Sequence, residues 1–256
     1  MPETYKRLKE LIGKDTQARF DLIEQETKVL GLNPKIYELA SPRGNDRHLV
    51  VHFDYGKDSE LWLTANYDTA DRLPAANNNA SGVVALLGLS EYLRDVTLPA
   101  NMRIVYFDAG LDTDLITKRR RNSDFVPGSE LFLQHMVDEE IEFIDTYTGA
   151  IVVQAVGKGN LSVFERTGRK LENSAELNDK IIAHGKSTRV PVELRTQSPN
   201  ADNISFIKEG LKATVLARYH EGSWHRMQTE ADDLTNVSAQ TVDETINFLF
   251  GVLKNG

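Results

Sequence analysis

The apolar residues of this chain follow two spacings, one typical of helices and one typical of strands. Leu8, Leu11 and Ile12 recur at helical spacing near the start, and the segment from Val242 to Leu253 does so near the end. Runs rich in β-branched and aromatic residues lie between such segments, bounded by Gly, Pro, Asn and Asp. The pattern predicts helices over 8–12, 20–30, 81–93, 131–137, 177–184, 204–209 and 242–253, and strands over 36–39, 48–53, 61–65, 102–107, 150–153, 161–164, 192–194 and 213–217.

The order of these segments predicts a three-layer α/β fold. The first three strands come in succession and indicate an antiparallel edge that leads into a central strand. Strands and helices then alternate, which favours a mixed, mostly parallel twisted sheet with helices on both faces. No linker or internal repeat interrupts the pattern, so we expect a single domain over 1–256. In such folds ligands lie at the carboxyl ends of the strands.

Composition and charge narrow the chemistry. The net charge of −8 argues against general attraction to nucleic acid or to anionic lipid. The absence of cysteine excludes disulfides, thiolate metal sites and a cysteine nucleophile, so any metal must be held by His, Asp or Glu. The N-terminal residues lack the apolar core of a signal peptide, and no apolar run is long enough for a membrane span. We therefore expect a cytoplasmic protein without membrane association.

Polar motifs follow the predicted strands in a characteristic order. They are Asn66-Tyr67-Asp68 after the strand over 61–65, the turn Ala75-Ala76-Asn77-Asn78-Asn79-Ala80-Ser81-Gly82, the segment Asp108-Ala109-Gly110-Leu111 with Gly128-Ser129 downstream, Asp202-Asn203-Ile204-Ser205-Phe206, and Trp224-His225 with Asp232-Asp233-Leu234. In this order the motifs resemble those of the zinc-dependent di-zinc aminopeptidases and glutaminyl cyclases. The resemblance implies the zinc-aminopeptidase fold, which is of the phosphorylase/hydrolase-like type.

Most positions that the resemblance assigns to metal or base carry other residues here. Family ligands correspond to Asn66, Asn77 (the bridging aspartate), Gln154 and His225, while the general base and a further ligand correspond to Gly110 and Leu111. Amides bind zinc poorly, and Gly110 and Leu111 have no titratable group. Asp68 is retained, but its family role is to orient the missing histidine.

We therefore expect a degenerate family member with no catalytic residues and no cofactor. His225 is the one direct ligand of five that remains, whereas zinc usually requires three or four. Neutral amides also relieve the repulsion that clustered carboxylates would suffer without a metal ion. On this interpretation the polar cleft persists and binds a small molecule, a peptide end or a protein partner.

Three alternatives remain open at this level. A metal-dependent hydrolase could use a rearranged zinc site built from His225, Asp68 and Asp112, and the chain could instead act as a non-catalytic subunit beside active relatives. The asparagines at 77–79 could bind a ligand through their amides or cap the helix that begins near Ser81.

Overall fold

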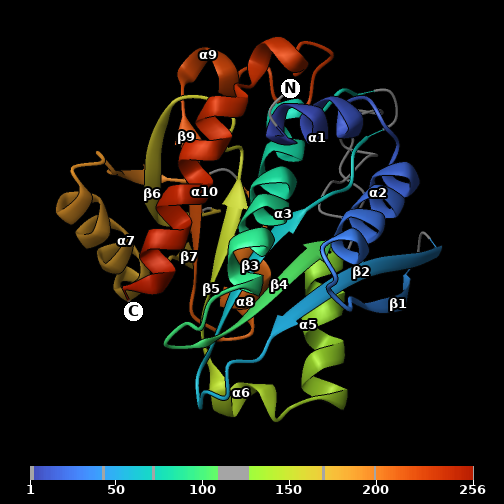
Figure 1. The fold of residues 1–256 in the computed structure, drawn as a ribbon, viewed down its shortest axis with the longest axis vertical. Coiled ribbons are helices and arrows are strands. Elements are labelled where there is room, and N and C mark those ends of the chain that lie inside the picture. The colour runs from blue at the N-terminus through green and yellow to red at the C-terminus, as the bar shows by residue number, and fades with distance from the viewer. Residues whose placement is uncertain are drawn as a thin grey trace.

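The computed structural model describes residues 3–41, 44–70, 73–108, 127–168, 171–198 and 200–255 (Figure 1). Within this part of the chain lies a nine-stranded sheet. Its strand order is β1-β2-β4-β3-β5-β9-β6-β7, and β8 also pairs with β6. The strands are β1 (Lys35–Ser41), β2 (Gly44–Phe53), β3 (Glu60–Asn66), β4 (Asn101–Phe107), β5 (Tyr147–Gln154), β6 (Asn160–Thr167), β7 (Leu171–Glu172), β8 (Glu193–Gln197) and β9 (Ala213–Tyr219).

The centre of the sheet is parallel and its flanks are largely antiparallel. β4, β3, β5 and β9 pair in parallel, whereas β1 with β2, β2 with β4, and β6 with both β9 and β7 are antiparallel. The antiparallel edge and the central strand at β3 are as the sequence predicts. The expected mixed α/β sheet is confirmed, with its parallel pairings concentrated at the centre.

Helices cover both faces of this sheet. They are α1 (Glu3–Leu11), α2 (Thr16–Val29), α3 (Ser81–Arg94), α5 (Gly128–Glu139), α6 (Phe143–Thr146), α7 (Ala175–Thr188), α8 (Asn203–Lys208), α9 (Glu221–Trp224) and α10 (Ala239–Lys254), with a π-helical turn η1 (Ala76–Ala80) and a 3-10 turn η2 (Leu234–Asn236). One apolar cluster holds residues of α1, α2, α3, α7 and α10, and a second holds residues of α5, α6 and α8. Leu63 of β3 belongs to the first cluster and its neighbour Trp62 to the second. Since successive side chains of a strand point to opposite faces, the two clusters lie on opposite faces of the sheet.

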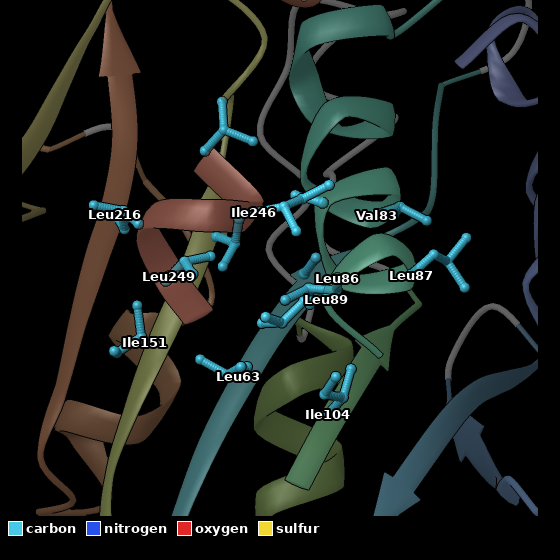
Figure 2. Packing of buried hydrophobic residues seen from close by; sticks show 14 of the residues in the cluster. Leu63, Val83, Leu86, Leu87, Leu89, Ile104, Ile151, Leu216, Ile246 and Leu249 are labelled. Carbon is cyan, nitrogen blue, oxygen red and sulfur yellow. The ribbon is translucent and has the colours of Figure 1, made fainter. Parts of the chain in front are cut away.

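α3 is the centre of the larger cluster. Its sequence is apolar on most sides because it lies between the sheet and the outer helices, and eleven of its fourteen residues are buried. Figure 2 shows Leu86 and Leu89 of α3 near Leu63 and Ile104 of the strands, with Ile246 and Leu249 of α10 alongside. This packing holds the N-terminal end of α3, and the turn η1 before it, against the sheet.

The sequence pattern does not predict five short elements, namely α6, α9, η1, η2 and β7. Each has five residues or fewer, which is too few for an apolar period to be seen. Among the described helices, none is long and apolar enough to cross a membrane.

Two glycines of α3 allow a matched test of this packing. A Cβ on Gly82 would overlap the backbone carbonyl of Val153, whereas a Cβ on Gly88 would meet only the flexible end of the Ile246 side chain. We expect Gly82→Ala to lower the free energy of unfolding by about 3 kcal/mol. Gly88→Ala should cost less than about 1 kcal/mol, because the gain in helix propensity offsets the crowding. Equilibrium urea denaturation measures both, and equal losses would mean that the β5 backbone moves freely at this contact.

Candidate functional site

Three residues that the sequence analysis singled out reach the same edge of the sheet. β3 ends at Asn66, Asp68 follows two residues later, and β5 ends at Gln154. Because β3 and β5 pair in parallel with Thr64 opposite Val152, their last residues come to the same edge. All three side chains are buried, at 4% exposure each. The structure therefore brings these predicted site residues together.

The amide of Asn66 contacts protein groups at both ends. Its Nδ2 donates a hydrogen bond to Asp68 Oδ1 at 2.9 Å, and its Oδ1 lies 3.3 Å from Asn79 Nδ2. A carboxylate can only accept, so the bond to Asp68 sets the orientation of the amide. Asn66 thus presents an N–H, and not a lone pair, to the nearby carboxylate.

Asn79 joins the ends of the two central strands. Besides facing Asn66, its Nδ2 donates to the carbonyl of Val153 at 3.0 Å, and its Oδ1 accepts from the backbone N–H of Ala155 at 3.0 Å. The side chain has no solvent exposure. A buried amide that donates and accepts in this way stabilises the arrangement of β3, β5 and η1.

Asn78, to which the resemblance assigns no metal role, is the asparagine that meets Gln154. Gln154 Nε2 donates to Asn78 Oδ1. The Asn77 side chain instead donates to Ser223 Oγ at 3.0 Å and accepts from the Gly157 N–H at 2.8 Å. The sequence motif does not distinguish one adjacent asparagine from another, and only the backbone path through η1 decides which of them meets Gln154.

Of the two alternatives for these asparagines, capping of the following helix is wrong. The N-cap residue of α3 is Ala80, and no side-chain hydrogen bond caps it. The physical reason is that the amides are already engaged by Gly157, Ala155 and Gln154. We call Asn66, Asp68, Asn77, Asn78, Asn79 and Gln154, which hydrogen-bond to one another or to neighbouring groups around the ends of β3 and β5, the amide network.

A buried cation that sequence reasoning missed lies beside the amide network. Arg19 has no solvent exposure, and its guanidinium donates to the carbonyls of Lys14 at 3.1 Å and Pro74 at 2.8 Å. Burial lowers the Arg19 pKa to about 10, opposed by the charges of Asp68 and Asp232, so the side chain stays cationic at neutral pH. The available signal was an arginine on the apolar face of α2, four residues before the buried Ile23.

Asp232 anchors the turn that carries the asparagines. Its carboxylate accepts from the backbone N–H groups of Asn77 at 2.9 Å and Asn78 at 3.0 Å, and from Asn236 Nδ2 at 2.7 Å. Burial raises the Asp232 pKa, whereas these hydrogen bonds and Arg19 act to lower it. The motif that resembles the family contained Asp232, but the sequence offered no role for it.

A second buried carboxyl group, Asp202, precedes α8. Burial raises its pKa to about 7, a hydrogen bond from Ser129 acts in the opposite direction, and the charge of Asp68 adds to the rise. Among the described residues, its Oδ2 atom has no hydrogen-bond partner. Asp202 is therefore a group whose charge changes near neutral pH inside the protein.

His225 lies in a different environment from the amide network. It follows α9, its side chain is 78% exposed, and its Nε2 lies 3.9 Å from Glu221 Oε1. Asp68, its proposed partner in a rearranged metal site, is buried and accepts from Asn66. Gly110, Leu111 and Asp112 lie outside the described residues, so the predicted roles of these three positions stay predictions.

Solved structures with a similar fold include zinc exopeptidases and glutaminyl cyclases. The chain is similar to Fimbriiglobus ruber glutaminyl cyclase, with a TM-score of 0.78, 15% identity and coverage of 99% of this chain and 95% of that one. It is also similar to a leucine aminopeptidase precursor from Bacteroides thetaiotaomicron (TM-score 0.77, 14% identity, 99% and 94% covered) and a Zn-dependent exopeptidase from Parabacteroides distasonis (0.75, 15%, 99% and 96%). At these identities the likeness establishes the fold.

The sequence places the chain in a family. The model of Peptidase family M28 matches residues 49–251, so the chain belongs to Peptidase family M28. No curated protein sequence matches it significantly. The resemblance drawn from the motifs is thereby confirmed at the level of family and fold.

The residues that the resemblance assigns to the metal positions, as far as the structure describes them, offer a poor set of zinc ligands. Asn66 turns an N–H toward Asp68, and Gln154 donates its N–H to Asn78, whereas zinc requires lone pairs from imidazole or carboxylate. In the part of the chain that the structure describes, no group of three or more His, Cys, Asp or Glu side chains is placed to hold a metal ion. The donor set thus disagrees with the chemistry that the family implies.

Asn66→Asp tests this donor set with an isosteric change. The variant places a second carboxylate against Asp68 and removes the N–H between them. We expect a loss of about 3 kcal/mol in unfolding free energy at pH 8, with partial recovery at pH 5 as the pair takes up a proton. Denaturation at both pH values measures it, with exposed Asn33→Asp as control. Full rescue by added zinc at pH 8 would contradict the mismatch with zinc.

Asp202 predicts a specific pH dependence of stability. Its pKa is raised to about 7 when folded, so the folded state binds a proton between about pH 4 and 7 that the unfolded state does not. Its contribution is therefore present at low pH and is lost as pH rises through 7, by a few kcal/mol. The stability difference between wild type and Asp202→Asn, measured by denaturation across this range, should therefore change with pH. A pH-independent difference for Asp202→Asn would place its ionisation elsewhere.

Proposed function

We propose that this chain is a non-hydrolytic member of Peptidase family M28 that acts by binding, without a resident metal ion. The observation that carries the proposal is that amide N–H groups stand between the strand ends where the family would present metal ligands. The Asn66 N–H bonds to Asp68, and the Gln154 N–H bonds to Asn78. An N–H directed at a neighbour leaves no lone pair there for a cation.

The electrostatic balance of the site supports this proposal. A cluster of carboxylates needs a dication to offset its repulsion, whereas neutral amides carry no charge that must be offset. The charges that remain nearby include the buried carboxylate of Asp68 and the buried guanidinium of Arg19, whose attraction compensates burial in part. A fixed internal cation supplies some of the compensation that a metal ion would supply.

The contacts of the amides also favour a structural use of these positions. Asn79 bonds to the backbone at Val153 and Ala155, and Asn77 bonds to the backbone at Gly157. Such bonds fix the loop after β5 against η1. On this proposal the family fold is retained as a rigid framework whose ligand is a small molecule, a peptide end or a protein partner.

Metal content and turnover test the proposal together. Protein purified without chelator, and again after exposure to excess zinc, should hold far less than one zinc per chain by elemental analysis. A chelator should leave the thermal midpoint unchanged, and aminoacyl nitroanilides should not be hydrolysed while an active zinc aminopeptidase cleaves them in parallel.

The opposite result is equally specific. Near-stoichiometric zinc that is lost in His225→Ala, together with metal-dependent turnover that the same substitution abolishes, would overturn the proposal. That outcome would establish a hydrolase with a rearranged metal site involving His225.

A further inference from the structure

A cavity of about 460 Å³ opens between α7, α10 and the adjoining ends of β6 and β9. It shares no residue with the amide network, and its ligand-binding properties are independent of the proposed function. Its volume falls within the range typical of small-molecule sites. Its lining residues are Asn160, Leu161, His184, Thr188, Val190, Pro191, Arg218, Glu244, Asn247 and Phe248.

The lining divides into an apolar part and a polar part. Leu161 and Phe248 are buried, and Val190 and Pro191 lie toward the exposed side. These four side chains offer a surface for a hydrocarbon or aromatic body. A ligand of matching character must therefore be amphipathic.

Arg218 supplies a preorganised cation in this cavity. Its side chain is only 9% exposed, its Nε donates to Thr245 Oγ1 at 2.9 Å, and its Nη1 donates to the carbonyl of Gly159 at 2.9 Å. Thr245 in turn donates to the carbonyl of Thr241 at 3.0 Å, so its hydroxyl is oriented to accept from Arg218. Two neutral partners hold the guanidinium in place without neutralising it.

The guanidinium of Arg218 also contacts a carboxylate that can turn away from it. Nη2 lies 3.2 Å from Glu244 Oε2, but the Glu244 side chain is 52% exposed. A half-exposed ion pair is weakened by solvent, and its carboxylate can turn outward at little cost. A carboxylate presented from within the cavity would meet the same guanidinium edge in a drier setting, where the interaction is stronger.

The other titratable group of the lining limits the charge of the ligand. Burial lowers the pKa of His184, so this imidazole is neutral at pH 7 and adds no second positive charge. With Arg218 as the one cationic side chain of the lining and Glu244 at the rim, a second negative charge on the ligand would lack a partner. Dicarboxylates and phosphates are disfavoured for that reason.

We propose that this cavity binds a small monocarboxylic acid with an aliphatic or aromatic body. The carboxylate takes the place of Glu244 on the Arg218 guanidinium, and the apolar body packs against Leu161 and Phe248.

Paired probes test the proposal on the full chain. Hexanoate and phenylacetate are titrated by calorimetry and by amide chemical-shift changes, each beside its neutral amide, hexanamide or phenylacetamide. We expect saturable binding of the acids and at least about tenfold weaker binding of the amides, because only the acids form the ion pair with Arg218. Equal affinities for acid and amide, or no saturable binding of either acid at millimolar concentration, would overturn it.

Substitutions at the rim separate the ligand site from a folding effect. Glu244→Gln removes the competing carboxylate from an exposed position and should tighten acid binding several-fold, whereas Pro191→Glu adds a negative charge at the rim and should weaken acid binding more than amide binding. Arg218→Lys should weaken acid binding by about tenfold, because an ammonium lacks the planar fork. Arg195→Lys, at an arginine over the Tyr219 ring outside the cavity, is the matched control and should change nothing. Unchanged acid affinity in both rim variants would contradict the proposed carboxylate position.

Discussion

The hydrogen bonds of Asn79 are the interaction on which the rest of the site depends. One side chain faces Asn66 at the end of β3 and bonds to the backbone at Val153 and Ala155 at the end of β5. Because the side chain is fully buried, removing any of these partners would leave a polar group unsatisfied at a cost of about 1–3 kcal/mol. Asn79 and Asp68 therefore hold the two ends of the Asn66 amide, its oxygen and its N–H.

Charge in this region is arranged around buried groups that compensate one another. Arg19 interacts favourably with Asp68 and Asp232, and Asp232 is further satisfied by backbone N–H groups of η1. Asp202 has less compensation of its buried charge, and burial raises its pKa to about 7. A site organised around metal ions would need these carboxylates charged and directed at the metal, whereas here they accept hydrogen bonds from the protein.

Membership of the family does not by itself establish the chemistry of this protein. The match to Peptidase family M28 and the likeness to zinc exopeptidases and glutaminyl cyclases establish the fold. Function depends on the residues that a fold carries, and the motif resemblance assigns amides of this chain to the family's ligand positions. The cavity beside Arg218 indicates how the same framework can offer a ligand site on another part of its surface.

The sequence by itself determined the α/β class, the antiparallel edge, the central strand and the family, because apolar periodicity and the order of motifs are properties of the chain alone. It also placed Asn66, Asp68 and Gln154 at strand ends that meet. Only the tertiary structure decided that Asn78, and not Asn77, faces Gln154, since that depends on the backbone path through η1. It likewise revealed Arg19, Asp232 and the cavity around Arg218, because these contacts join residues far apart in the chain.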